Sequence, residues 1–338
     1  MYNDDDLNSA VQVGIFSRDA VAAFRQQVGQ QRSSSTVDEE QFRLIGGFND
    51  FFVVIACLLM LVSVSWIGSE VESWLGAMLA AATAWGLAEY FIRVRRMALP
   101  SIVLLLTFVG GVSMTALLFL ASLTWSEGND SPVVALMACL AGAGAAWLHW
   151  RRFQVPITVA AGAVTLVGAA LFSLLALFPE LKNIMLLLVF VAGLLLFALA
   201  MRWDASDTLR QTRRSDVAFW LHLAAAPLLV HPIFALLGVL DQEGGVLQAL
   251  SVGLLYLLIA LVSISIDRRA LMVSALVYVL YAITLLLREY GVVSLSFAFA
   301  ALTIGGGLLV LSAFWHRCRE WVLPFYPKKM RAYFPALK

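Results

Sequence analysis

Residues 184–201 read IMLLLVFVAGLLLFALAM, a run of eighteen positions without a single charged side chain. A helix needs about 20 apolar residues to cross roughly 30 Å of hydrocarbon, so this run predicts a membrane-spanning helix. The whole chain agrees with that prediction, because 61% of its 338 residues are apolar and 13% are charged. Soluble domains have about half and about a quarter of their residues in these classes. With a mean hydropathy of +0.87, the chain is expected to be a membrane protein.

Nine further stretches of similar length and apolarity lie between short polar turns. Transmembrane strands would alternate apolar and polar residues over about ten positions, whereas these runs are continuously apolar. The sequence therefore predicts an all-α polytopic bundle of about ten transmembrane helices. The predicted spans are 50–68, 74–92, 101–123, 133–150, 156–178, 184–201, 217–240, 246–266, 270–287 and 292–315.

Basic residues follow every second predicted turn and also occupy both termini. Of the 23 Lys and Arg residues, all except Lys182 and Arg288 fall on one side of the predicted bundle. Cytoplasmic loops retain Lys and Arg, so both termini are predicted to be cytoplasmic. The expected location is the inner membrane of a bacterium, with the lipid bilayer as the main partner.

Three segments organise the chain. Residues 1–48 are predicted to form a cytoplasmic helical leader and linker, residues 49–316 the ten-helix transmembrane domain, and residues 317–338 a basic cytoplasmic tail. The tail mixes aromatic residues with Lys and Arg, which favours a position on the anionic lipid surface. The alternative is that these basic residues serve topology alone.

The leader has the pattern of two short helices. Residues 4–13 are predicted to be helical up to Gly14, and Ser17 is placed to cap a second helix that runs to about residue 28. The second helix carries one apolar stripe, which can dock on the membrane surface, on the protein's own loops or on a cytoplasmic protein partner. The stripe consists of Ala20, Val21, Phe24 and Val28.

The segments AVQVGIFSRDAVAAFRQQV (10–28) and FRLIGGFNDFFVVIACLLMLVSVSWIG (42–68) carry a resemblance. Together they resemble the opening of bacterial multi-pass membrane proteins that contain a domain of unknown function. The resemblance covers about the first 70 residues and departs from the pattern at Asn49 and Asp50. It implies an inner-membrane protein without an assigned chemistry, and it carries over no functional residue.

The predicted span 217–240 contains most of the residues with functional potential. His231 lies near its middle beside Pro232, and Pro227 lies one turn earlier. A proline removes a backbone N–H, which predicts a kink and frees carbonyls that lipid does not tolerate outside protein or a cavity. We therefore hypothesise that His231 lines a polar pocket or pathway. The alternative is a neutral histidine that makes one interhelical hydrogen bond.

Other ionisable groups complete the set of pathway or pocket candidates. At about 100° per residue, Asp216 and Trp220 fall on the same face as Pro227 and His231, whereas His222 lies on a different face. In an earlier span, Glu89 precedes Arg93 by four residues, which favours an ion pair at the cytoplasmic surface over proton-coupled work. The candidates are His231, His222, Asp216, Pro227, Trp220 and Glu89.

Several functions are disfavoured by the sequence. A net charge of +1 gives no global basic field for nucleic acid. The three cysteines lack the spacing of a disulfide framework or zinc site, and no metal or cofactor motif accompanies the histidines. Runs of glycine and alanine at 110–111, 141–146 and 305–307 are attributed to close helix packing. We expect no cofactor, no metal and no catalytic residue.

Three functional hypotheses stay open. The first is a transporter or exporter of a small or lipophilic molecule, since ten spans with short loops resemble drug/metabolite carriers built from five plus five helices. The second is a structural, regulatory or assembly protein that acts through its cytoplasmic leader. The third is a lipid-modifying membrane enzyme, which the absence of a nucleophile–base pair in the sequence pattern disfavours.

Overall fold

The computed structural model describes residues 10–11, 13–21, 23–24, 48–123, 131–208, 213–238, 246–289, 296–327 and 334. Every regular element among these residues is a helix, as predicted. The chain forms two compact units, residues 1–44 and residues 45–338.

The first unit confirms both helix-end predictions in the leader. Gly14 has a φ of +79°, and its N–H donates to the carbonyl three residues earlier at 3.1 Å. The Ser17 hydroxyl accepts a hydrogen bond of 3.1 Å from the backbone N–H three residues later. Within the predicted stripe, Val21 is 4% exposed and Phe24 is 48% exposed. Residues 25–47, including the end of the stripe and the linker, lie outside the described residues.

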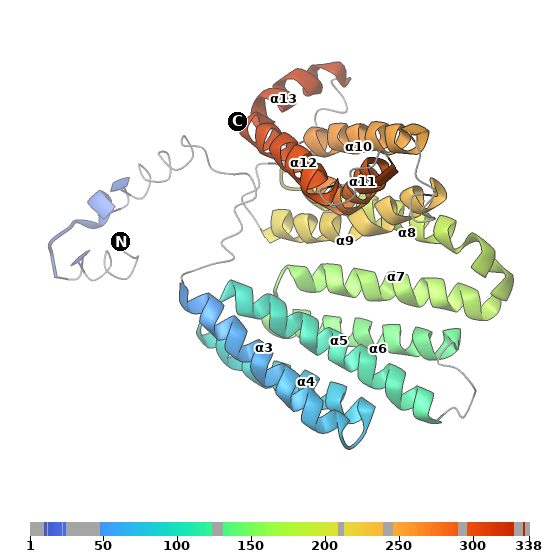
Figure 1. The fold of residues 1–338 in the computed structure, drawn as a ribbon. Coiled ribbons are helices and arrows are strands. Elements are labelled where there is room, and N and C mark those ends of the chain that lie inside the picture. Colours follow the sequence, from blue (N-terminus) through green and yellow to red (C-terminus); the bar gives the residue numbers. More distant parts are fainter. Residues whose placement is uncertain are drawn as a thin grey trace. The chain divides into compact units, whose positions relative to one another are not determined.

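In the second unit, helices occupy each of the stretches where spans were predicted (Figure 1). Two short elements extend them, the π-helix η1 (Glu89–Val94) after α4 and the 3₁₀ helix η2 (Pro179–Ile184) before α8. The short helix α13 (Trp315–Val322) and the 3₁₀ turn η3 (Leu323–Phe325) follow the last long helix. The long helices are α3 (Phe48–Ser69), α4 (Ser73–Ala88), α5 (Ala98–Leu123), α6 (Pro132–Phe153), α7 (Ile157–Leu177), α8 (Met185–Ala205), α9 (Arg213–Leu236), α10 (Val246–Ile266), α11 (Ala270–Glu289) and α12 (Ser296–Ala313).

Among the described residues, seven helices are long and apolar enough to cross a membrane, namely α3 to α9 with η1 and η2. Among the described residues, helices α10, α11 and α12 contain shorter apolar segments. Large apolar side chains on the outer surface, such as Leu195 at 69% and Leu309 at 74% exposure, suit contact with lipid. The helices are therefore compatible with a multi-pass membrane protein. The number of ten spans and the side of the termini stay predictions.

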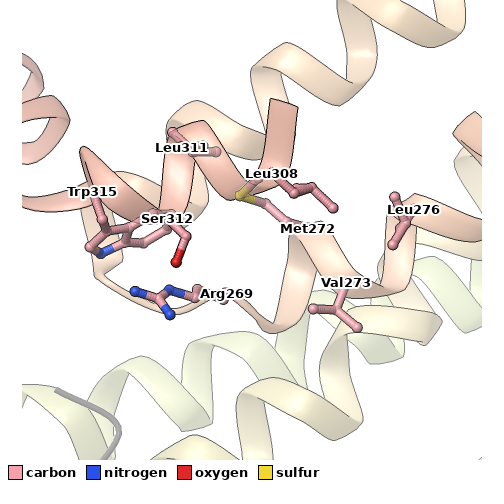
Figure 2. A pocket seen from close by; sticks show the side chains of 8 residues that line it. All are labelled: Arg269, Met272, Val273, Leu276, Leu308, Leu311, Ser312 and Trp315. Atoms are coloured by element: carbon pink, nitrogen blue, oxygen red, sulfur yellow. The ribbon is translucent and has the colours of Figure 1, made fainter. Parts of the chain in front are cut away.

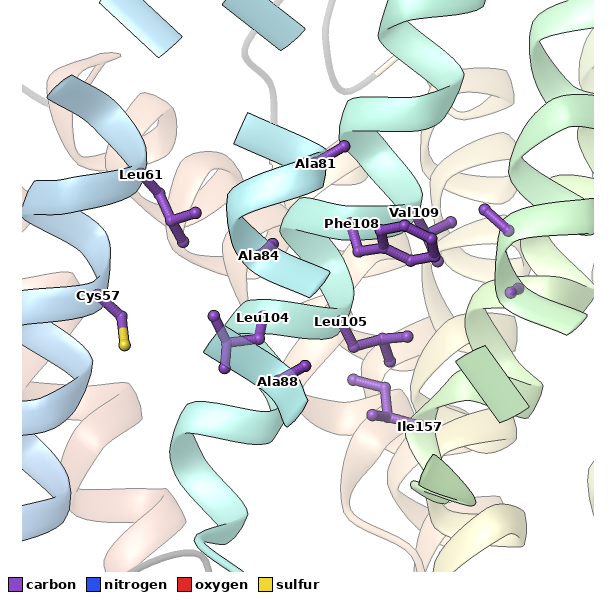
Figure 3. Packing of buried hydrophobic residues seen from close by; sticks show 12 residues of the cluster. Cys57, Leu61, Ala81, Ala84, Ala88, Leu104, Leu105, Phe108, Val109 and Ile157 are labelled. Atoms are coloured by element: carbon purple, nitrogen blue, oxygen red, sulfur yellow. The ribbon is translucent and has the colours of Figure 1, made fainter. Parts of the chain in front are cut away.

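Neighbouring helices in the sequence pack side by side, α3 on α4, α4 on α5, α5 on α6, α6 on α7, and α8 on α9. Figure 3 shows one core of this packing, in which small residues of α4 such as Ala84 lie against Leu104 and Leu105 of α5. Close packing at glycine is confirmed in α5, where a Cβ on Gly111 would lie 2.9 Å from the Ala81 Cβ. It is not found at 305–307, because a Cβ on these glycines would meet nothing described within 4 Å.

Helix α9 is the most enclosed of the seven. In its most apolar 18-residue window 56% of residues are buried, against 33% or fewer in the others. It stays helical from Arg213 to Leu236 through Pro227 and Pro232. Because Pro232 has no N–H, the Leu228 carbonyl loses its partner within the helix. Gly193 of α8 packs there, and a Cβ on it would lie 3.1 Å from the Leu228 oxygen. A bend in α9 stays a prediction.

Candidate functional site

Charged side chains are buried at the end of the bundle where α8 and α10 finish. Asp204 is 2% exposed, Asp267 3%, Arg268 2% and Arg319 0%, and the imidazole of His222 beside them is also 0% exposed. An unpaired buried charge costs several kcal/mol, so these groups have to satisfy one another. We name these five residues the charged cluster.

The backbone at the end of α10 positions two members of the cluster. The Arg268 N–H donates to the Ser263 carbonyl at 3.0 Å, and the Asp267 N–H donates to the Ile264 carbonyl at 3.3 Å. This pair of bonds is the Schellman arrangement, which requires a left-handed residue at the helix end. Asp267 takes that conformation with a φ of +57°, one that aspartate tolerates better than most side chains. The turn thereby sends two adjacent charges to different partners.

The Arg268 guanidinium binds the Asp204 carboxylate in the last turn of α8 in a bidentate manner. Its Nη2 lies 2.7 Å from Asp204 Oδ1 and its Nε lies 3.2 Å from Asp204 Oδ2. The same guanidinium donates to the Ser215 carbonyl of α9 at 3.3 Å and lies 5.9 Å from the centre of the Phe219 ring. Bidentate charge-assisted bonds of this kind are among the strongest in proteins. Arg268 therefore joins α8, α9 and the α10–α11 turn.

His222 of α9 belongs to the same cluster. Its Nε2 lies 3.4 Å from Asp204 Oδ2, and its ring centre lies 5.2 Å from that of Phe197. One turn deeper on the same face of α9 is Ala226, which is 0% exposed and packs against α10 and α11 residues. The cluster thus caps an apolar interface that runs into the bundle.

Asp267 holds the short helix α13. Its Oδ1 accepts a hydrogen bond of 2.7 Å from Trp315 Nε1, and its Oδ2 lies 3.2 Å from Arg319 Nη1. Burial lowers the pKa of the Arg319 guanidinium, and the Asp267 carboxylate acts in the opposite direction. A guanidinium nevertheless stays charged in proteins. The pair therefore requires both charges in the folded state.

Two further polar links lie at the ends of earlier helices. Glu89 Oε1 lies 2.7 Å from Arg152 Nε, and Glu89 Oε2 lies 3.0 Å from Arg93 Nη1, which confirms the predicted pair with Arg93. Arg213 donates to Gln154 Oε1 at 3.4 Å. These contacts join η1 to α6 and α6 to α9, so the ends of α4, α6, α8 and α10 lie on one side of the second unit. We call this side the charged end.

The structure separates the predicted candidates into two groups. His222 joins Asp204 and Arg268, whereas His231 is exposed on the other face of α9 with its Nδ1 2.7 Å from Tyr278 Oη. Nine residues correspond to about 900° around a helix, which is why the two imidazoles point to opposite sides. Pro227 is exposed as well, and Asp216 is half-buried in the first turn of α9. Trp220 packs between two cores.

An open groove of about 650 Å³ runs along α3, α4 and α5, from the middle of these helices toward the end opposite the charged end. Its lining combines apolar side chains with Ser65, Ser69, Glu70 and Thr107. The Glu70 carboxylate accepts a hydrogen bond of 3.0 Å from Trp66 Nε1. The described residues contain no group of three or more His, Cys, Asp or Glu side chains suited to a metal ion.

Sequence reasoning missed Asp204, Asp267 and Arg268. The arginines at the turns are explained by topology alone, and that explanation leaves the carboxylates beside them without a role. A usable signal was present, because each carboxylate lies within two residues of an arginine at a turn, in RWD (202–204) and in DRR (267–269). A carboxylate retained at the end of an apolar span is costly unless it has a partner.

Comparisons with known proteins add no assignment. No protein-family model, no curated protein and no solved structure matches the chain. A function is therefore inferred from the charged cluster and from the groove on α3, α4 and α5.

Proposed function

We propose that the protein is a carrier for a small or lipophilic molecule, and that the charged cluster is its gate on the cytoplasmic side. In this proposal the chain spans a bacterial inner membrane about ten times with both termini inside. The arginine-rich turns support that orientation, since basic loops stay in the cytoplasm. The observation that carries the proposal is the buried Arg268–Asp204 pair between α8, α9 and the α10–α11 turn.

Apolar packing would join these helices at lower cost than buried charges do. Replacing a buried ion pair by hydrophobic residues of similar volume is often neutral or stabilising, so such pairs are weak evidence for a purely stabilising role. A pair of charges has a property that apolar residues lack. It attracts strongly when dry and weakly when water enters, because water solvates both partners. That property suits a contact that must form and break.

The arrangement of the cluster identifies the movable part. The α10–α11 turn is held on one side by Arg268 and on the other by Asp267. Separation of these contacts releases the charged end of the α10–α11 hairpin from α8, α9 and α13. On α3, α4 and α5, the open groove of about 650 Å³ has the size of a small-molecule site and an amphipathic lining.

A cysteine at position 226 tests the gate without knowledge of the substrate. In a background lacking Cys57, Cys139 and Cys318, we expect Ala226→Cys to react with a small membrane-impermeant thiol reagent applied at the charged end. Transient opening exposes this position, which is 0% exposed in the closed structure. D204L/R268M replaces the charges by an apolar pair that water does not solvate. We expect labelling in this background to be at least about tenfold slower, because an increase of about 1.4 kcal/mol in the free energy of opening lowers the open population tenfold.

Two control variants make the result decisive. Ser206→Cys, exposed at the end of α8, has to react in every background. Ala84→Cys, 0% exposed in the core of α4 and α5, has to stay unreactive. If the Ser206→Cys variant reacts while the Ala226→Cys variant is unlabelled from both sides, the charged cluster is a static contact and the carrier proposal is wrong.

The leader favours a second candidate function, that of a structural or regulatory protein. In the first unit, Val13 is 73% exposed, Ile15 69% and Phe16 48%, which is an apolar surface suited to a partner. Deletion of residues 1–30 discriminates between the two functions. If the protein is a carrier, the deletion is expected to keep the labelling rate of Ala226→Cys within about twofold. If it is a regulatory protein, the deletion is expected to abolish its function in the cell, and Ala226→Cys is expected to stay unlabelled with or without the leader.

A further inference from the structure

A second cavity lies between α11, α12 and α13 at the charged end. It has a volume of about 210 Å³ and is lined by Arg269, Met272, Val273, Leu276, Leu308, Leu311, Ser312 and Trp315. Figure 2 shows the Arg269 guanidinium and the Ser312 hydroxyl at one side of the cavity, with Val273 and Leu276 at the other. We propose that this cavity binds one anionic phospholipid, with the headgroup at Arg269 and an acyl chain between α11 and α12.

The order of side chains along the cavity matches the polarity of a lipid. Arg269 immediately precedes α11 at the charged end, and the α11 residues that line the cavity follow it within seven positions. At about 1.5 Å per residue, the cavity reaches roughly 10 Å into the apolar layer. The cation and the hydroxyl thus lie at headgroup depth, whereas Leu308 lies about one turn and Leu276 about two turns deeper, at the depth of the first methylene groups. A volume below the 300 Å³ or so of drug-sized sites suits a single chain.

The surroundings of the cavity favour a lipid over water. Val273 is 60% exposed and Leu309 74% exposed on the same helices, so this face is apolar. A cavity with an apolar lining stays dry, and between lipid-facing helices an acyl chain is the available apolar group.

The charges at the mouth favour an anionic headgroup. The Arg269 guanidinium lies 4.9 Å from the centre of the Trp315 ring, and that indole is fixed by its bond to Asp267. The Asp267 carboxylate is directed to Trp315 and Arg319 and does not line the cavity. Arg317 of α13 is exposed as well, but it does not line the cavity, and its guanidinium lies 5.6 Å from the centre of the Phe314 ring. Basic pockets between helices at a membrane surface suit anionic headgroups, and an indole at this depth is typical of an interface.

Native mass spectrometry of the full chain released from detergent micelles tests the site. We expect one phosphatidylglycerol to be retained at concentrations where phosphatidylcholine is not. Arg269→Gln is expected to weaken retention about fivefold, which corresponds to roughly 1 kcal/mol for one basic residue at the surface. Arg317→Gln, which removes an exposed arginine outside the cavity lining, is the matched control and is expected to retain the lipid.

A second pair of variants tests the apolar part of the site. Ser312→Phe fills the cavity and is expected to abolish retention, whereas Ala313→Phe places the same ring on the next, exposed residue of α12 and is expected to have no effect. Equal retention of the two lipids, equal effects of the two arginine variants, or displacement by inorganic phosphate alone would each overturn the proposal. None of these measurements depends on gating at Ala226, so the lipid site and the carrier function succeed or fail separately.

Discussion

Arg268→Met is expected to lower the free energy of unfolding by about 3–5 kcal/mol, because it leaves the Asp204 carboxylate buried without its arginine. Asp204 is 2% exposed, so water does not replace the lost guanidinium, and the His222 imidazole lies farther away at 3.4 Å. A loss of this size approaches the whole stability of many proteins. The measurement is reversible unfolding in mixed micelles as the fraction of a denaturing detergent increases.

Two matched variants separate the charge from the side-chain volume. D204L/R268M removes both charges and is expected to recover stability to within about 1 kcal/mol of the wild type or to exceed it. Arg202→Met removes an exposed arginine two residues from Asp204 and is expected to change stability by less than about 0.5 kcal/mol. If the single and double variants unfold at the same detergent fraction, Arg268 and Asp204 are not coupled and the gate loses its basis.

The same double variant distinguishes a gate from a structural contact. If the pair is a structural contact, D204L/R268M keeps the fold and the labelling rate of Ala226→Cys does not change. If the pair is a gate, the same variant keeps the fold but opens less often, because the apolar pair stays closed when water is present. A stable protein with slowed labelling of Ala226→Cys is therefore the combination expected of a carrier.

Much of the fold was predictable because it depends on local properties of the sequence. Continuous apolar runs such as 184–201 define helices by length and transfer free energy, and the turns between them were identified from charge and proline. Ser17 and Gly14 mark helix ends through hydrogen bonds between residues three positions apart. The Glu89–Arg93 pair follows from the four-residue spacing of a helix.

The cluster was not predictable because its contacts depend on which hairpins are neighbours. Asp204 and Arg268 are 64 positions apart, as Glu89 and Arg152 are 63 apart. The opposite directions of His222 and His231 followed from helical periodicity. The periodicity does not say which of the two imidazoles faces inward, because α9 is apolar on all sides near them and its orientation is set by its contacts with α7, α8 and α11.

The second large effect is expected at the contact between the α10–α11 turn and α13. Asp267→Gly keeps the left-handed backbone and relieves about 1 kcal/mol of its conformational cost, yet it removes the carboxylate that holds Trp315 and Arg319. Loss of this partner of the buried guanidinium costs about 3–5 kcal/mol. The net loss of at least about 2 kcal/mol corresponds to roughly thirtyfold more frequent opening of α13.

Limited trypsin digestion measures that opening through cleavage after Arg317, which lies inside α13. Cleavage that requires local unfolding follows the population of the open state, so we expect a rate about thirtyfold above the wild type in Asp267→Gly. D267G/R319M removes both charges and is expected to return most of the protection. Glu320→Gln, which removes an exposed carboxylate from the same helix, is expected to be cleaved at the wild-type rate.

Equal cleavage of Asp267→Gly and the wild type would mean that α13 is held by its apolar contacts alone. Faster cleavage without faster labelling of Ala226→Cys would show that the Asp267 contact anchors α13 while Arg268 by itself closes the bundle.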